Sequence, residues 1–554
     1  MNLVIIGGGQ SGLVTCKTFI ENNFKVLLLE KGNKKNGLFS NVLEKEYFRW
    51  SSSRYISGFS DFPIPKNFPV WMNFKQYCQY LELYKKKNNL DKFIQYNSNV
   101  ISVKKKDTKW EIIFVINKEE RIIYSDFLIV TTGLNSYPKY PKLGDFKGEI
   151  IHTDTIYSKM NKNNWKDKFS NKNILLIGGG ESALDIGNLL LNYSKELYYS
   201  TRSYIEWFPE WAYSKDFLNN NKLCHKKSIT GLTIKTPSDT HLSYLEYSLP
   251  TPVSGFWHLF GRKLLLNFWK NSKINCVHNN KKLCDITETP ENLFAKPVIK
   301  RTSFICDIHN NRVKVIYYPT KFLNNKIVSK DGIFNIDIIV TGSGYKVFIP
   351  FISEKYYNCE LIKKMVPKID PTIGFVGYVR PTMGSINNIS EMQSWWLVDY
   401  FKGNLNYKIR NLKWGRPEDP LNIGRNIVIG NYYMKDLAMD LKIMPNLTYI
   451  LITDPKLWVK IMHNTIHPSL FRIYGKMKIK NGKNKYYNTF PSLKEKSDFL
   501  IFYLMFIIFH IIFLLILFMI LFLMYKYFNS KKTNYLRFLI IYIILIHIIY
   551  DSML

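Results

Sequence analysis

The chain begins with Met1-Asn2-Leu3-Val4-Ile5-Ile6-Gly7-Gly8-Gly9-Gln10-Ser11-Gly12, a short apolar run that leads directly into a glycine-rich turn. A helix-like stretch follows to Asn22, and the next apolar run, residues 25–29, ends at Glu30. Strand, G-x-G-x-x-G turn, helix, strand and acid, in this order, are typical of a dinucleotide-binding βαβ unit. The sequence therefore predicts a Rossmann-like domain at its N-terminal end.

The glycines of this turn have separate roles in a dinucleotide fold. Gly7 allows the tight turn, Gly9 lets the backbone approach a pyrophosphate, and Gly12 lets the helix pack on the strand. Free N–H groups at the start of the helix, where Ser11 lies, attract phosphate charge. Because Glu30 can accept hydrogen bonds from a ribose diol, we expect these five residues to bind a diol-bearing nucleotide such as FAD.

A second copy of the pattern spans residues 174–186, where an apolar run leads into Gly178-Gly179-Gly180 and a second helix-like stretch. Its third glycine is Ala183, which the pattern tolerates because only helix packing depends on it. The next strand-like run ends at Arg202 instead of an acid, and an arginine there can meet the 2′-phosphate of NADPH. The residues expected to bind NADPH are Gly178, Gly180, Ser182, Ala183 and Arg202. The alternative that Arg202 is an ordinary surface charge stays open.

The two turns together favour a flavoprotein in which electrons pass from nicotinamide to flavin. A later apolar run, residues 336–342, is typical of a return strand that closes the first domain. The predicted fold class is α/β, with two Rossmann-like dinucleotide-binding domains and the NADP domain inserted in a discontinuous FAD domain. The predicted ranges are 1–154 and 326–475 for the FAD domain and 155–325 for the NADPH domain. Asp337, Thr132 and Gly133 are added to the expected FAD site.

Charge and cysteine content exclude several other classes of protein. The 554 residues contain 77 Lys+Arg and 43 Asp+Glu, a net charge of +34 that could indicate nucleic acid or an anionic membrane surface. The lysines are scattered, with no basic helix and no RNA-binding aromatic pattern, so no nucleic acid partner is expected. The seven cysteines form no C-x-x-C pair. This predicts free thiols in a reducing compartment, no metal site and no disulfide reductase.

The C-terminal end is strongly apolar. Residues 499–525 are 27 residues without a charge, long enough to cross a bilayer of about 30 Å, and they predict a transmembrane helix. Residues 538–554 contain a shorter apolar run that could be re-entrant, interfacial or a second span. The preceding basic linker, residues 476–498, is richer in lysine than the following flank. The positive-inside rule therefore places the large domain in the cytosol.

Several short motifs follow one another in order along residues 1–475. Phe146-Lys147-Gly148-Glu149-Ile150-Ile151-His152 has the form F-x-G-x-x-x-H. The other stretches are residues 59–65, 180–186, 374–379, 391–396, 433–438, 445–447 and 453–457, with Pro468. Taken with the two glycine turns, they resemble the flavin-containing monooxygenases, particularly the membrane-anchored animal type. That family has an aromatic residue four positions after the histidine, where this chain has Ile156, and Tyr157 follows.

The resemblance implies an NADPH- and FAD-dependent monooxygenase similar to dimethylaniline monooxygenase. In that family NADPH reduces FAD, the reduced flavin takes up O₂, and the C4a-hydroperoxyflavin oxygenates a soft nucleophile, such as the nitrogen of an amine or the sulfur of a sulfide. The flavin supplies the difficult chemistry, while the protein supplies binding, orientation and a dry pocket. The resemblance also implies attachment to the endoplasmic reticulum membrane.

The resemblance implies roles for further residues. Gly37 and Leu38 match part of the family's Gly-Gly-Leu-Trp after the ribose acid, so both are expected at FAD. Ser51 stands where animal members have an asparagine near the flavin, and it is the expected catalytic residue together with Gln393, which is expected to line the flavin pocket. A serine has no second amide donor. His152 lies between the predicted domains and is expected to be structural.

Other functions remain open at this point. If Ser51 fails to protect the oxygenated flavin, the protein would be an uncoupled NADPH oxidase that releases hydrogen peroxide. A Baeyer–Villiger oxygenase or an amino-group hydroxylase is a related alternative, although no Trp-Pro pair follows Tyr157 as in the ketone oxygenases. A membrane-tethered flavoprotein scaffold is the non-enzymatic alternative, and the intact glycines of both turns argue against it. Neither the substrate nor the oligomeric state follows from the sequence.

Overall fold

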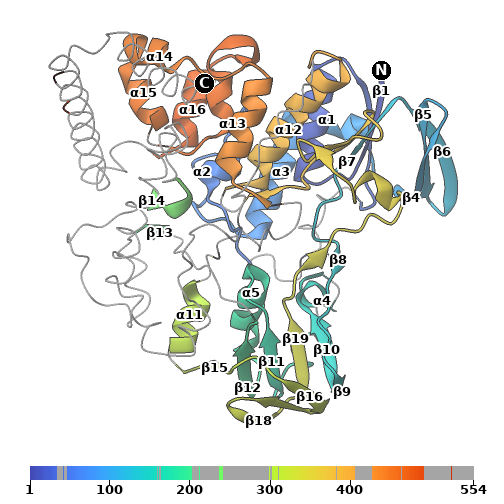
Figure 1. Ribbon diagram of the computed structural model, residues 1–554, viewed down its shortest axis with the longest axis vertical. Helices are drawn as coiled ribbons and strands as arrows, with labels where there is room; N and C mark the ends of the chain where they lie inside the picture. The colour runs from blue at the N-terminus through green and yellow to red at the C-terminus, as the bar shows by residue number, and fades with distance from the viewer. Residues whose placement is uncertain are drawn as a thin grey trace. The chain divides into compact units, whose positions relative to one another are not determined.

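The computed structural model describes residues 1–33, 42, 47–158, 160, 164–202, 211–212, 236–240, 299, 302–309, 311–381, 384–405, 427–462, 464–491, 519 and 526. The chain divides into two units, of which unit 1 comprises Met1–Glu210, Cys276–Leu447 and Ile466–Phe490. Unit 2 comprises Trp211–Asn275, Thr448–Thr465 and Pro491–Leu554. Unit 1 contains both glycine-rich turns and is drawn mainly as coloured ribbon in Figure 1.

The first sheet of unit 1 contains five parallel strands in the order β23-β7-β1-β2-β3. They are β1 (Asn2–Ile6), β2 (Lys25–Leu29), β3 (Ile94–Gln95), β7 (Phe127–Val130) and β23 (Ile373–Phe375). β1 is at the centre, and its apolar residues are buried because parallel sheets are covered on both faces. The predicted N-terminal Rossmann-like unit is confirmed in this sheet.

Two helices pack against each other beside the first sheet, α1 (Gln10–Glu21) and α12 (Ile386–Phe401) (Figure 1). Their contact contains two hydroxyl pairs, Ser11 Oγ with Ser390 Oγ at 2.9 Å and Thr15 Oγ1 with Ser394 Oγ at 2.9 Å. Small hydroxyl side chains allow a close approach and satisfy each other's hydrogen-bonding groups. α12 is thereby fixed to the helix that follows the first glycine turn.

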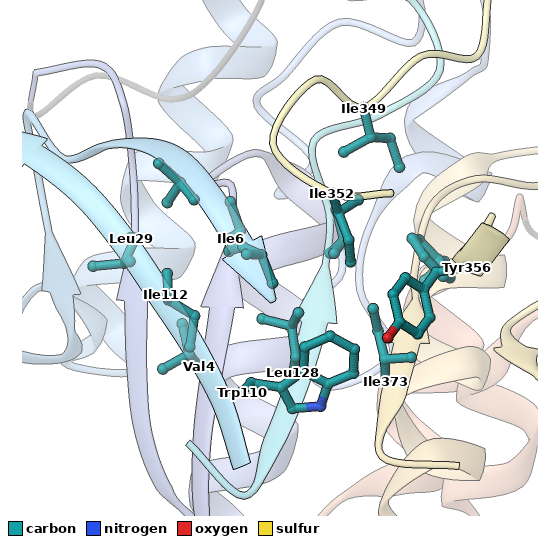
Figure 2. Packing of buried hydrophobic residues seen from close by; sticks show 14 of the residues in the cluster. Val4, Ile6, Leu29, Trp110, Ile112, Leu128, Ile349, Ile352, Tyr356 and Ile373 are labelled. Carbon is teal, nitrogen blue, oxygen red and sulfur yellow. The ribbon is translucent and has the colours of Figure 1, made fainter. Parts of the chain in front are cut away.

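A three-stranded antiparallel sheet contributes the other side of the core, with β4 (Asn99–Lys106), β5 (Lys109–Ile116) and β6 (Glu119–Ser125). Figure 2 shows its Trp110 and Ile112 in one cluster with Val4 and Leu128 of the first sheet. Ile373 of β23 belongs to the same cluster. Residues distant in sequence therefore close one core around β1.

The second sheet has the order β10-β19-β11-β12-β15, and all its strand pairs are parallel. Its strands are β10 (Glu149–His152), β11 (Asn173–Ile177), β12 (Glu196–Ser200), β15 (Lys314–Val315) and β19 (Ile338–Thr341). β19 pairs with β11 in the register Ile174 to Ile338. The prediction that residues 336–342 close the first domain is therefore wrong, and β23 occupies that place. A buried apolar run is typical of a strand in any parallel sheet, so its composition does not predict which strand it pairs with.

The second sheet also extends beyond the predicted limits of 155 and 325. β10 and β19 both lie outside that range, and a side sheet joins β9 (Asp145–Phe146) to β16 (Lys321–Asn324), β17 (Lys326–Ser329) and β18 (Gly332–Asn335). Two connectors link this part to the first sheet, β8 (Tyr137–Pro138) and β20 (Tyr345–Lys346), and they pair antiparallel. The chain thus leaves the first domain before β9 and returns to it through β20.

The remaining helices and strands lie around these sheets. In unit 1 they are α2 (Arg54–Ser57), α3 (Phe74–Lys87), α4 (Thr153–Ser158), α5 (Glu181–Leu190), α11 (Thr302–His309), β21 (Leu361–Ile362), β22 (Val366–Pro367), β24 (Arg380–Pro381), β25 (Ile427–Val428), α13 (Gly430–Asp440) and α16 (Gly482–Thr489). Unit 2 contains β13 (Trp211–Ala212), β14 (Thr236–Pro237) and α15 (Pro455–Met462), and α14 (Leu447–Thr453) begins at the boundary.

The predicted membrane segments lie almost entirely outside the described residues. Of residues 499–525 the structure describes Met519 alone, and it describes none of residues 538–554. Within the part of the chain that is described, no helix has both the length and the apolar character needed to cross a bilayer. The transmembrane helix therefore stays a prediction from the sequence.

Candidate functional site

The first glycine turn connects β1 to α1 and has the geometry that its sequence requires. Gly7 has φ +109°, a conformation that side chains rarely adopt, and a Cβ there would lie 3.0 Å from the Thr131 carbonyl oxygen. A Cβ on Gly12 would overlap the Gly7 carbonyl oxygen. Each of these two positions therefore needs glycine for the turn and the helix to pack together.

Gly9 faces open space, because no atom lies within 4 Å of the position that its Cβ would take. α1 begins at the next residue without a side-chain cap and without an acid in its first turn. The N–H groups of its first turn are therefore uncapped, and this end of the helix carries partial positive charge. A diphosphate could approach the backbone here, so the turn fits the pyrophosphate of FAD.

Glu30 is buried at the carboxyl end of β2, with 8% of its surface exposed. Its Oε2 accepts a hydrogen bond from the Gly8 N–H at 2.5 Å, and its Oε1 accepts one from the Gly32 N–H at 2.7 Å. A carboxylate has about four lone-pair sites, so two backbone donors leave capacity for ribose hydroxyls. The two backbone bonds fix the carboxylate beside the first turn, where the predicted diol would lie.

Ser11, Thr132 and Gly133 lie near this turn. Ser11 directs its hydroxyl to Ser390 of α12, so its side chain serves helix packing, and its backbone N–H is the group left for a phosphate. Thr132 Oγ1 lies 2.5 Å from Tyr378 Oη, and Gly133 has φ +82° with no atom near its missing Cβ. Both follow β7, which neighbours β1, and their edge is the one where ligands of parallel sheets bind.

The two residues predicted to be catalytic have different surroundings. Gln393 is fully buried, its Oε1 accepts from the Gly377 N–H at 3.0 Å, and its Nε2 donates to Tyr433 Oη at 2.9 Å. The amide oxygen thus holds the turn at Gly377 and the amide nitrogen holds Tyr433 of α13, which gives Gln393 a positioning role, while the predicted pocket-lining role stays a prediction. Ser51 is half-buried, and the adjacent Ser52 Oγ donates to the Gly384 carbonyl at 3.0 Å.

The second turn solves its packing differently. Gly178 has φ +138°, and a Cβ there would lie 2.5 Å from the Gly342 carbonyl oxygen. Ala183 stands where the third glycine would be, and a Cβ on Gly342 would lie 2.6 Å from the Ala183 Cβ. Gly342, directly after β19, therefore leaves the space that the Ala183 methyl fills. The sequence showed a glycine after an apolar run but not its partner.

The predicted phosphate contacts of this turn remain accessible. Gly180 has no atom within 4 Å of its missing Cβ, and Ser182 is half-buried in the first turn of α5. That turn also contains Glu181, and α5 has no side-chain cap. Arg202 is exposed just beyond the end of β12, where a 2′-phosphate could meet it. The geometry thus fits NADPH at the second sheet.

Three further residues, Asp337, Gly37 and Leu38, are predicted to bind FAD. Asp337 accepts a hydrogen bond from the Asn173 N–H through Oδ2 at 2.8 Å, at the start of β11. The second glycine turn follows the other end of β11, so Asp337 lies at the amino edge of the second sheet and its assignment to FAD is wrong. Gly37 and Leu38 lie outside the described residues.

His152 is buried next to the connectors between the sheets. Its Nδ1 accepts from the Asp154 N–H at 3.1 Å, so Nε2 carries the proton and donates to the Gly344 carbonyl at 3.0 Å. The rings of Tyr140 and Tyr345 contact it at centroid distances of 5.5 and 5.2 Å. These contacts support the structural role predicted for the histidine.

Tyr157, the displaced aromatic of the F-x-G-x-x-x-H motif, packs its ring on Phe48 at 4.4 Å. Its hydroxyl donates to Asp185 Oδ2 of α5 at 3.3 Å. Ile156, the residue in the family's aromatic position, is fully buried. The one-residue slip therefore places the aromatic ring between α5 and the segment that precedes Ser51.

A buried network of charges was not predicted. Glu391 of α12 accepts from Ser60, and its Oε1 lies 3.6 Å from Arg472 Nη2, while Asp61 Oδ2 lies 3.2 Å from Lys17 Nζ. Burial raises the pKa of Glu391, and Arg472 opposes that shift. Burial also acts on Asp61, yet Lys17 beside it keeps the pKa of Asp61 below its usual value. The four charges balance, as buried charges require.

The described residues contain no group of three or more His, Cys, Asp or Glu side chains that could hold a metal ion.

A family model described as Flavin-binding monooxygenase-like matches residues 1–230 and 261–526. The chain belongs to this family. It is therefore a flavin monooxygenase that uses FAD and NADP(H), and the two turns described above are the places that fit them.

The matches to similar proteins extend over most of this chain and most of each relative. A 4-hydroxybenzoate brominase (decarboxylating) from Marinomonas mediterranea is 27% identical over 519 residues, which cover 89% of this chain and 93% of the relative. Dimethylaniline monooxygenase (N-oxide-forming) 2 from Cavia porcellus is 27% identical over 513 residues, covering 85% and 88%. The structure of cyclohexanone monooxygenase from Rhodococcus sp. Phi1 bound to NADP⁺ matches with a TM-score of 0.54 at 14% identity, and the match covers 80% of this chain and 97% of that one. This last likeness shows the α/β fold.

Proposed function

We propose that this flavin-binding monooxygenase-like protein uses NADPH and O₂ to oxygenate a soft nucleophile, the nitrogen of a small amine or the sulfur of a sulfide. The observation that carries the proposal is the pairing of two different coenzyme turns in unit 1. One is followed by the buried acid Glu30, which suits a diol, and the other by the exposed cation Arg202, which suits a 2′-phosphate. The similarity to a dimethylaniline monooxygenase supports the substrate class.

The proposed reaction needs no acid or base catalysis of the substrate by the protein's side chains. When bound, the flavin activates oxygen, and a soft nucleophile needs no proton removed before it reacts. The buried carboxylates of Glu391 and Asp61 are occupied by Arg472 and Lys17. The chain's residues therefore bind and orient the coenzymes and exclude water, with Gln393 holding the Gly377 turn beside α1.

The test is the ratio of oxygenated product to NADPH consumed. We expect protein purified with FAD to consume NADPH faster when trimethylamine, dimethylaniline or a methyl sulfide is added, with the N-oxide or S-oxide as product. Bromide belongs in the panel because one relative is a brominase. NADPH oxidation that no amine or sulfide accelerates would refute the proposed substrate class, whatever the response to bromide. Protein that stays colourless with added flavin would refute FAD binding.

A second candidate is an uncoupled NADPH oxidase. The observation that favours it is Ser51, which stands where the family's animal members have an asparagine and is only half-buried. A serine provides one donor where an amide provides two. If this candidate is right, hydrogen peroxide equals NADPH consumed with every substrate, and Ser51→Asn lowers the peroxide yield. A Baeyer–Villiger or amino-hydroxylating activity would instead appear as product from a ketone or a primary amine.

We further propose that residues 499–525 anchor the protein in the endoplasmic reticulum membrane with unit 1 in the cytosol. The charge-free run, its basic preceding flank and a family match that extends to residue 526 support this. Removal of residues 497–554 is expected to release the protein from membranes. If the truncated chain stays in the pellet after a carbonate wash, these residues are not its sole attachment.

A further inference from the structure

Ile466–Phe490 is the last part of unit 1 before the apolar end of the chain. It forms two short 3₁₀ turns, η5 (Pro468–Arg472) and η6 (Gly475–Met477), and the helix α16. It contains no Asp or Glu, and its cations are Arg472, Lys476, Lys478, Lys480, Lys483 and Lys485. We call this part the basic bracket.

The first half of the basic bracket is fixed to the flavin-binding part of unit 1. His467 is fully buried, its Nδ1 accepts from the Ser469 N–H at 3.1 Å, and its Nε2 donates to the Gly58 carbonyl at 3.2 Å. Arg472 Nε donates to Ser60 Oγ at 3.1 Å, and the guanidinium lies 4.3 Å from the Trp395 ring centroid of α12. These contacts hold the bracket against α12 and against Gly58 and Ser60.

The second half presents its charge to solvent. Lys476, Lys478, Lys480 and Lys483 are exposed, while Tyr486 between them and the apolar end is buried. Lys476 Nζ lies 2.8 Å from Asp399 Oδ2, a pair that is exposed on the lysine side and therefore weak. The bracket thus keeps a cationic surface although its other side is packed.

The distance to the proposed anchor is limited by the chain itself. Seven residues lie between Pro491 and Phe499, so the chain takes eight residue-to-residue steps, and at no more than about 3.6 Å per step the gap is at most about 29 Å. The residue that follows the basic bracket therefore lies within about 29 Å of the start of the proposed anchor. By the positive-inside rule the membrane face that the anchor enters is the cytosolic face, whose leaflet carries anionic lipids.

We propose that the exposed lysines of the basic bracket bind the anionic headgroups of the membrane in which the chain is anchored. This proposal rests on the anchoring proposed above. Because His467 and Arg472 fix the bracket to the part of unit 1 that contains the FAD turn, lipid contact also sets how that part faces the membrane. A charge run is often only a solvated surface, but this one is packed against α12 through Arg472 and is followed by the proposed anchor.

The test uses the full-length protein in nanodiscs of phosphatidylcholine alone or of phosphatidylcholine with phosphatidylserine. Hydrogen exchange of peptides covering residues 474–485 is expected to slow about fivefold or more in the anionic discs, since one lysine near such a surface accounts for a factor of about five. The effect should shrink between about 0.1 M and about 1 M salt, where the screening length falls from about 10 to about 3 Å.

Lys478→Glu/Lys480→Glu/Lys483→Glu is expected to abolish the difference between the two lipids. The matched control Lys104→Glu/Lys118→Glu/Lys326→Glu reverses three exposed lysines of the β4–β6 and β16–β18 sheets and should keep it. Equal exchange in both lipids, or a difference that survives reversal of the bracket, overturns the proposal. Failure of the wild-type protein to enter phosphatidylcholine discs would instead overturn the anchor.

Discussion

Ala183 of α5 packs against Gly342, the residue that follows β19, at a distance where a methyl group on Gly342 would lie 2.6 Å from the Ala183 Cβ. The second coenzyme turn therefore depends on a glycine from a distant strand. The first turn meets the same requirement within its own motif, because Gly12 faces the Gly7 carbonyl. The helix thus packs closely on the strand in both sheets, but the glycine that allows it lies on the helix in the first sheet (Gly12) and directly after a strand in the second (Gly342).

Gly342→Ala is expected to weaken NADPH binding, because the added methyl overpacks the turn at a cost of about 1–3 kcal/mol. That cost corresponds to a rise of roughly 5- to 150-fold in the Kd for NADP⁺, measured by titration calorimetry, with flavin absorbance unchanged. Ala183→Gly/Gly342→Ala should recover part of the affinity, since it removes one of the two methyl groups. Equal affinity for wild type and Gly342→Ala would show that the contact does not control the turn.

Arg202→Ala is expected to reduce the preference for NADPH over NADH. The exposed guanidinium lies just after β12, and loss of a bond to a charged phosphate costs about 1.5–3 kcal/mol, or about 10- to 150-fold in the ratio of kcat/KM values. Lys195→Ala, at the opposite end of β12, is the matched control and should leave the ratio unchanged. An unchanged ratio in Arg202→Ala means that another group reads the 2′-phosphate.

Glu30→Gln is expected to lower FAD affinity. An amide has one acceptor oxygen, so it cannot accept from both the Gly8 and the Gly32 N–H groups, and its NH₂ would face one of these donors. An unmade buried hydrogen bond costs about 1–3 kcal/mol, which raises the Kd of FAD by roughly 5- to 150-fold. Flavin fluorescence after dialysis measures the loss. Glu120→Gln on the exposed strand β6 should retain its flavin, and equal retention in both variants would argue against this role for Glu30.

His467 makes the folded protein sensitive to acid. Burial lowers its pKa from 6.5 to about 3, so below pH 6.5 the unfolded chain binds a proton that the folded chain does not. The stability from the neutral ring is present above pH 6.5 and is lost as the pH falls toward 3, at up to about 1.4 kcal/mol per pH unit. Urea unfolding at pH 7.5 and 5.0 should therefore show a smaller loss of unfolding free energy for His467→Gln. Parallel losses in both proteins would contradict the assignment.

Much of the geometry of the first coenzyme turn was predictable from local sequence. The conformation of Gly7 and the open backbone at Gly9 follow from steric limits on a few consecutive residues, and Glu30 follows its strand at a fixed spacing. Such features are encoded within one βαβ unit. The structure therefore shows them as the sequence predicts, although Gly37 and Leu38 lie outside the described residues.

Contacts between segments that are distant in sequence were not predictable from local patterns. Residues 338–341 pair with β11 in the second sheet, so Asp337 lies at the amino edge of that sheet and not at the FAD turn. Gln393 accepts a hydrogen bond from the Gly377 turn, and Arg472 forms an ion pair with Glu391. A buried strand or a polar side chain carries no local mark of its partner, because pairing depends on how the whole chain crosses over and packs. Two coenzyme turns with different ribose partners are encoded in short stretches of consecutive residues, whereas the strands and side chains that support them come from distant segments and depend on how the whole chain packs.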